Sequence, residues 1–174
     1  MADVRDELVV HDEDGALASD FVHAVVAAIE EEDTQKVRAL VRELHTADTA
    51  DLIELLRPDD RLVFIDLLGR TFDVQALTDV DETVRDQLVE ELPTGTIASA
   101  VRRLESDDAV YLLENLDEEE QSEILAKVPK ADRETLRRSL DYDEDTAGRL
   151  MRTEFVAVPA FWSVGQTIDY MRTE

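Results

Sequence analysis

A period of twelve residues is the feature of this sequence that most restricts its fold. Starting at Leu44, every twelfth residue up to Leu140 is apolar, and so is each residue four positions earlier. The residues three positions earlier follow the same rule, with Arg137 as the one exception. Apolar residues at positions i, i+1 and i+4 lie on one face of an α-helix. The columns are Leu44, Leu56, Leu68, Val80, Leu92, Leu104, Leu116, Val128 and Leu140; Leu40, Leu52, Phe64, Ala76, Leu88, Ala100, Leu112, Ile124 and Leu136; and Val41, Ile53, Ile65, Leu77, Val89, Val101, Leu113 and Leu125.

Turn-forming residues commonly follow the last apolar position of a unit, as at Pro58, Gly69, Pro93 and Pro129. Each unit is therefore predicted to be one helix of about eight residues, roughly 12 Å long, followed by a tight turn. Helices this short are unstable alone and must bury their apolar face against neighbours. The sequence therefore predicts an all-α fold, a superhelical solenoid of short helices in 12-residue units.

The chain is predicted to contain four regions. Residues 1–18 are acidic and lack a sustained apolar stripe, so we expect a disordered arm there. Residues 19–141 form the helical domain, with two longer helices before the regular units, and residues 142–153 form a junction. Residues 154–174 are expected to be the first strand and helix of a second domain.

The end of the chain changes character. Residues 155–158 read FVAV before a proline and predict a β-strand, and residues 163–166 fit a capping box that opens a helix. One strand and one helix are too little for a stable domain. We therefore expect the chain to be a piece of a longer protein.

The charge of the chain excludes one class of partner. Forty-three acidic against 18 basic side chains give a net charge of −25, which repels nucleic-acid backbones. Such an acid-rich composition, with three lysines, is typical of proteins that work in molar salt, and solvation of the surface accounts for most of the acids. There is no cysteine, and no apolar run is long enough to span a bilayer, so we expect a soluble fragment that does not insert into a membrane.

The segment 142–151, YDEDTAGRLM, followed by FVAV at 155–158, resembles the junction of MgtE-type magnesium transporters and channels. In that family the junction joins a helical N-terminal domain to the first strand and helix of a CBS domain, and the 12-residue array is similar to that N-terminal domain. The resemblance implies a Mg²⁺-sensing domain on the cytoplasmic side of the cell membrane. Its partners would be its own CBS and transmembrane domains in a homodimer, and Mg²⁺ bridging the domains would close a pore that this chain lacks. Residues 152–153, Arg-Thr, depart from the Thr-Pro that is common in the family.

The resemblance also implies candidate Mg²⁺ ligands. An acid of the family falls on Asp107, with Asp108 beside it, but a second acid falls on Tyr111 and a further glutamate on Gln75. Acids nearby that are candidates to compensate for Gln75 are Asp73 and Asp79. Asp107 and Asp108 also have a simpler interpretation, because acids at a helix N-terminus are stabilising, and both roles are compatible. We expect Mg²⁺ to be regulatory and to bind weakly to this fragment alone.

The sequence also bears on other functions. The acidic run 117–120 lies in the first turn of a predicted helix, so it is better explained by the helix dipole than by metal binding. The sequence has no nucleophile elbow and no glycine-rich phosphate loop, so it is not predicted to be an enzyme. Two alternatives stay open: a protein-interaction scaffold like the helical repeats of the flagellar motor-switch protein FliG, and a soluble CBS-containing regulator without a pore.

Overall fold

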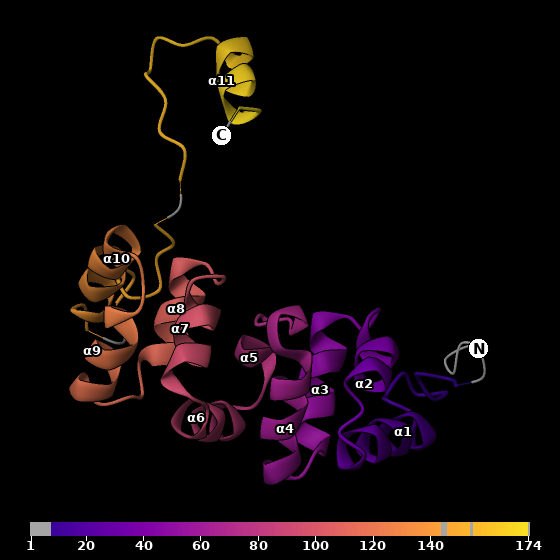
Figure 1. Ribbon diagram of the computed structural model, residues 1–174. Coiled ribbons are helices and arrows are strands. Elements are labelled where there is room, and N and C mark those ends of the chain that lie inside the picture. The colour runs from indigo at the N-terminus through magenta and orange to yellow at the C-terminus, as the bar shows by residue number, and fades with distance from the viewer. Residues whose placement is uncertain (1–7, 144–145, 154, 174) are drawn as a thin grey trace.

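The computed structural model describes residues 8–143, 146–153 and 155–173 of the chain (Figure 1). Within these residues the regular secondary structure is helical, which confirms the predicted all-α class. The elements are α1 (Ser19–Glu30), α2 (Thr34–Val41), α3 (Thr46–Leu55), α4 (Pro58–Leu68), the 3₁₀ helix η1 (Gly69–Thr71), α5 (Ala76–Asp79), α6 (Glu82–Glu91), α7 (Thr94–Val101), α8 (Ser106–Leu113), α9 (Glu118–Ala126), α10 (Lys130–Leu140) and α11 (Val164–Met171).

The period of twelve residues is visible in where the helices begin. Successive helices from α2 to α10 start twelve residues apart, or twenty-four apart across the unit that contains η1 and α5. The predicted apolar columns form the core, and all nine residues of the column from Leu40 to Leu136 are buried. The helix starts are Thr34, Thr46, Pro58, Glu82, Thr94, Ser106, Glu118 and Lys130.

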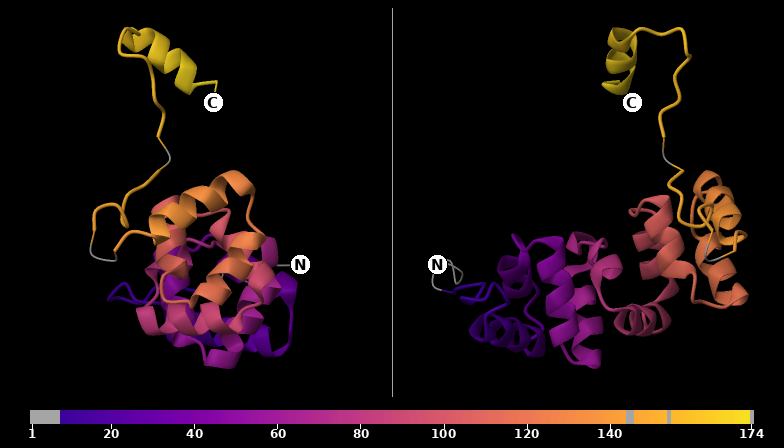
Figure 2. Two further views of the ribbon diagram at one scale, coloured as in Figure 1. Left: turned by 90° about the vertical axis from the view of Figure 1, so that its left-hand side faces the viewer. Right: turned by 180° about the vertical axis from the view of Figure 1, so that it is seen from behind.

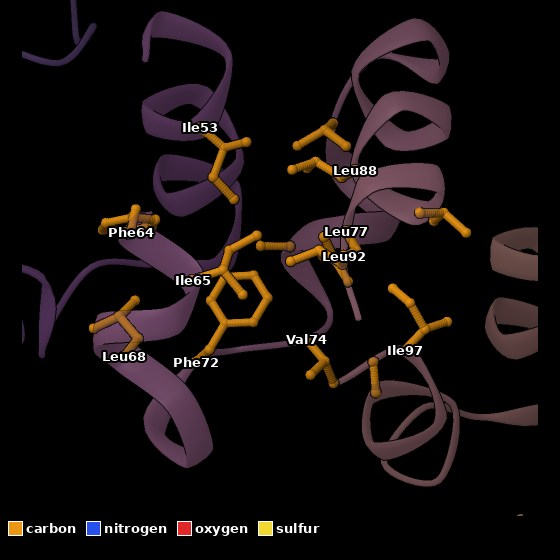
Figure 3. Packing of buried hydrophobic residues seen from close by; sticks show 14 of the residues in the cluster. Ile53, Phe64, Ile65, Leu68, Phe72, Val74, Leu77, Leu88, Leu92 and Ile97 are labelled. Atoms are coloured by element: carbon orange, nitrogen blue, oxygen red, sulfur yellow. The ribbon is translucent and has the colours of Figure 1, made fainter. Parts of the chain in front are cut away.

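The helices stack in an elongated array from α1 to α10 (Figures 1 and 2). Several helices of the array pack on their next-but-one neighbour, as α2 does on α4, α7 on α9 and α8 on α10. This arrangement gives the short helices the apolar contacts that they lack alone. In the middle of the array, Ile65 and Phe72 line a common cavity with Leu77 and Leu92 (Figure 3).

The unit after α4 departs from the prediction of one helix of about eight residues. Gly69 ends α4 with a φ of 53°, a left-handed conformation that glycine adopts without steric cost. The chain then buries Phe72 and Val74, which follow the short η1 helix, and α5 contains only four residues. The prediction is therefore wrong for this unit, because two apolar side chains outside the repeat columns pull the backbone into the core.

Residues 8–18 are folded against the array, so the predicted disordered arm is wrong for this part of the chain. Asp12 accepts hydrogen bonds from the backbone N–H groups of Asp14 and Ala16, which form a turn. The turn brings His11 and Leu17 together in an isolated antiparallel bridge, and Leu17 is buried in the core. Residues 1–7 of the arm lie outside the described residues.

The C-terminal segment leaves the array and ends in α11, which lies apart from the other helices (Figures 1 and 2). Residues 155–158 form no strand, and residue 154 is outside the described part. The strand prediction is wrong here because a strand needs a hydrogen-bonded partner, and no other extended segment among the described residues pairs with this one. The capping box that was predicted for α11 is confirmed: Ser163 and Gln166 exchange hydrogen bonds. Among the described residues, no helix has the length and apolar character needed to cross a membrane.

Candidate metal centre

Three carboxylates gather where α8 begins. The turn before α8 places Glu105 at the N-cap position, and Asp107 and Asp108 follow in the first helical turn. One carboxylate oxygen from each residue lies within 4.8 Å of the other two. Among the described residues, this is the only group of three or more potential metal-binding side chains. The structure therefore brings together two of the sequence-predicted residues and adds Glu105, which sequence reasoning missed although it stands two positions before Asp107.

Asp108 is held by a side chain from another repeat unit. Gln75 donates from Nε2 to Asp108 Oδ2 over 2.7 Å, and to Thr78 Oγ1 over 2.9 Å. Gln75 itself precedes α5, the short helix of the irregular unit. The departure from the repeat in that unit thus places an amide against the carboxylate cluster.

Asp107 faces residues 146–153, the linker that leaves the array after α10. Arg152 Nε donates to Asp107 Oδ2 over 2.9 Å, and Arg152 Nη1 forms an ion pair with Glu105. The hydrogen bond to Asp107 and the negative charge of Asp107 raise the pKa of the Arg152 guanidinium, and the charges of Glu105 and Asp108 act in the same direction. The second oxygen, Asp107 Oδ1, is buried and accepts no hydrogen bond from the described residues.

The linker is also fixed just before Arg152. Arg149 is buried, and its Nη1 donates to the carbonyl oxygens of Ser139, Leu140 and Tyr142 at the C-terminus of α10. Its Nε lies 3.7 Å from a carboxylate oxygen of Glu114, which follows α8. Arg149 thus ties the linker to the last helices of the array, so the residues that follow it pass close to the start of α8.

The donor set suits a hard cation. Mg²⁺ prefers oxygen ligands, keeps several water molecules, and is commonly held by one or two carboxylates. Three carboxylates against one guanidinium leave an excess of negative charge, and the buried Asp107 Oδ1 has no donor among the described residues. The side chain of Glu105 at the N-cap of α8 makes no capping hydrogen bond, so its carboxylate is not consumed by capping. Glu105, Asp107 and Asp108 therefore fit Mg²⁺ as partial ligands.

The other two predicted ligands lie outside this group. Both oxygens of Asp73 are occupied, because Oδ2 accepts from Thr46 Oγ1 over 2.7 Å and Oδ1 accepts from the backbone N–H of Gln75. Asp79 is an exposed residue at the end of α5. Neither residue belongs to the carboxylate group at α8.

The acidic run 117–120 and Tyr111 both have structural contacts of their own in α8 and α9. Asp117 and Glu120 form a capping box at the start of α9, which confirms a helix-terminal role for that acidic run. The ring of Tyr111, where the family has a second acid, packs on Arg85, with 3.9 Å between the ring centroid and the guanidinium carbon.

Comparison with known proteins agrees with this architecture. Residues 44–145 match the family model of the MgtE intracellular N domain. Two solved structures are similar: the soluble part of a magnesium transporter, with 19% identity and a TM-score of 0.73 over 88% of this chain, and the cytosolic domain of the Mg²⁺ channel MgtE in complex with ATP, with 25% identity and a TM-score of 0.72 over 87% of this chain.

The chain spans 61% of the first solved chain and 62% of the second, so it corresponds to about three fifths of each. None of the curated protein sequences is similar enough to match. The family model covers well over half of the chain, including α3 to α10 and the carboxylate group. The chain therefore belongs to the family of the MgtE intracellular N domain.

Proposed function

We propose that this chain is the Mg²⁺-sensing regulatory domain of a magnesium transporter, on the cytoplasmic side of the membrane. Glu105, Asp107 and Asp108 are its share of the Mg²⁺ site. The observation that carries this proposal is the position of the three carboxylates, which meet at the point where the linker leaves the helical array. An ion bound at that point lies between the array and whatever domain the linker carries.

The chemistry of the cluster supports weak, reversible binding. A bound Mg²⁺ supplies positive charge between acidic surfaces, and it needs only one or two carboxylates from each side. This chain contributes one side, so we expect weak binding to the isolated chain and tighter binding when a second domain adds ligands. Weak binding suits a sensor that must release the ion when its concentration falls.

The family and the exposed apolar side chains near α11 support a proposal about the partners. We propose that the linker leads to CBS and transmembrane domains of the same protein, and that the whole protein is a homodimer with a pore beyond this chain. Around α11, Phe155, Phe161, Val164 and Met171 are exposed apolar side chains. A second domain that covers them explains why a charged protein carries such a surface.

The energetic requirement for a switch is modest. Shifting a two-state equilibrium from 1:99 to 99:1 needs about 5.5 kcal/mol of differential binding, which several weak sites supply together. The carboxylates shift this equilibrium only if the ion binds them more tightly when the two domains are closed than when they are apart. In molar salt the Debye length is about 3 Å, so direct or water-bridged contacts must do the sensing.

Limited proteolysis of the full-length protein tests the proposal. Mg²⁺ is titrated at constant high ionic strength against potassium, and cleavage within residues 146–153 is followed. We expect Mg²⁺ to protect this segment in the wild type and to protect it much less in the double variant Asp107→Asn with Asp108→Asn. The protection reports closure of the domains and does not depend on transport.

The repeat offers a matched control. Glu118→Gln with Glu119→Gln removes the same charge from the first turn of α9, one repeat unit later. This control is expected to keep the protection of the wild type. Equal cleavage at all Mg²⁺ concentrations in the wild type would show instead that the array is an interaction scaffold whose acids serve only for solvation.

A further inference from the structure

Two residues of the linker dock on the start of α8, about 45 residues earlier in the chain. The Arg152 guanidinium spans Glu105 and Asp107. Beside it, the backbone N–H and the side-chain Oγ1 of Thr153 both lie 2.9 Å from Ser106 Oγ. Ser106 is buried, so the linker reaches into the helix terminus and does not merely lie over it.

The guanidinium occupies the carboxylates that the proposed function assigns to Mg²⁺. Two of the three carboxylates pair with Arg152, and the third accepts from Gln75. The second oxygen of Asp107 is buried in this arrangement. A cation therefore reaches Asp107 only if the neighbouring groups move.

The contact is weak enough to be reversible. The side chains of Arg152 and Glu105 are 56% and 51% exposed, and that of Asp107 is 24% exposed. Ion pairs with this exposure contribute little to stability and are weakened further by salt. Arg152 remains charged at any ordinary pH, so its release depends on competition for the carboxylates and not on deprotonation.

We propose that Arg152 is a tethered cation that competes with a divalent ion for Glu105 and Asp107. This inference rests on the proposed function, because the same carboxylates are the ligands. Without the ion, Arg152 and Thr153 hold the linker against α8. When an ion binds the carboxylates, the guanidinium is displaced from α8, and in the full-length protein the domain that the ion brings against the array then covers the linker. By linkage, docking of the linker lowers the affinity for the ion by the same factor by which the ion weakens docking.

The first measurement tests the docking without metal. Amide hydrogen exchange of Thr153 is followed by NMR in chelator and high potassium chloride, for the wild type, Arg152→Gln, and the control Arg42→Gln. Arg42 forms an exposed ion pair with Glu43 at the end of α2, so the control removes the same charge without removing a partner of Glu105 or Asp107. Loss of an exposed ion pair raises the exchange rate by up to about fivefold. We therefore expect the exchange of Thr153 to be faster in Arg152→Gln and unchanged in Arg42→Gln.

The second measurement titrates the same three proteins with magnesium chloride and follows the carboxyl signals of Asp107 and Asp108. We expect Arg152→Gln to bind Mg²⁺ about fivefold more tightly than the wild type and the control, because the competing pair is gone. Arg152→Lys keeps the positive charge but cannot contact Glu105 and Asp107 with two different nitrogens. Its affinity for Mg²⁺ should therefore lie between those of the wild type and Arg152→Gln.

The outcomes separate this inference from the proposed function. Unchanged exchange of Thr153 in Arg152→Gln would show that the guanidinium does not hold the linker, and the inference would be overturned. Faster exchange with equal or weaker Mg²⁺ binding would overturn the competition. If Mg²⁺ perturbs the carboxylates of no variant, the proposed site fails and the competition with it, whereas faster exchange would still establish the docking contact.

Discussion

Arg85 is the residue whose environment is least expected from the sequence. It lies in α6 with no exposed surface, although its position in the repeat follows no apolar column. Its Nε donates to Asp86 over 2.9 Å, its Nη2 lies 3.4 Å from Glu82, and its guanidinium stacks on Tyr111. Asn115 donates to the same two carboxylates and so closes the network. A planar cation on an aromatic ring joins α6 to α8 at this point.

The side chain of Arg85 is expected to act mainly through packing. We predict that Arg85→Ala lowers the free energy of unfolding by about 3 kcal/mol, because it empties a large buried volume. Arg85→Met should lower the free energy of unfolding by about half as much. Methionine fills that volume, and only the partly exposed Glu82 and Asp86 lose their cation. Urea unfolding in high potassium chloride, followed by circular dichroism, measures both. If the two variants are equally destabilised, the charge of Arg85 matters more than its volume.

At the scale of the helices, one position of the repeat recurs as a cap for the preceding helix. Arg61, Gln121 and Arg133 are each the fourth residue of their helix. Their side chains donate to backbone carbonyls at the end of the preceding helix or in the turn that follows it. The last carbonyls of a helix have no partner within it. The repeat therefore satisfies one helix terminus with a side chain from the next helix, which couples consecutive units.

We predict that Gln121→Ala lowers the free energy of unfolding by about 1–2 kcal/mol, because the carbonyls of Leu113 and Leu116 lose their donor. Gln121→Arg should restore most of the loss, since arginine makes this contact in two other units. Chemical unfolding of the two variants gives the comparison. Lys127→Ala serves as a reference, because its exposed pair with Glu123 is worth almost nothing. A failure of arginine to restore stability would contradict the shared role of this position.

At the scale of the whole molecule, the chain divides into a packed array and a separate C-terminal helix. The array buries the repeat columns in one continuous core, whereas α11 has no buried residue. A helix of eight residues without tertiary contacts is marginal in water. Cooperative unfolding should therefore belong to the array alone.

The single tryptophan gives a test of this division. Trp162 precedes α11 and contacts Tyr170, with 5.4 Å between ring centroids, and it has no place in the core of the array. We predict that its fluorescence changes little across the urea transition that circular dichroism detects in the array. A fluorescence transition that coincides with the loss of helical signal would instead mean that α11 is coupled to the array in solution.

The candidate site was partly predictable from the sequence. Asp107 and Asp108 stand in a first helical turn, and the period of twelve already located that turn. Asp73 is a sequence-predicted candidate to compensate for Gln75, yet its carboxylate accepts from Thr46 at the start of α3 and from the backbone N–H of Gln75. The contact between Arg152 and the carboxylates joins residues 45 positions apart, and nothing local in the sequence indicates it.

The sequence by itself determined the helical units, their length of twelve residues and their buried faces, because periodicity and turn residues act over one or two helical turns. It also determined the capping box of α11, for the same reason. Only the tertiary structure decided the irregular unit around α5, the folded segment 8–18, the absence of a strand at 155–158 and the docking of Arg152. Each of these depends on whether a distant segment is present to receive an apolar side chain, a hydrogen bond or a charge.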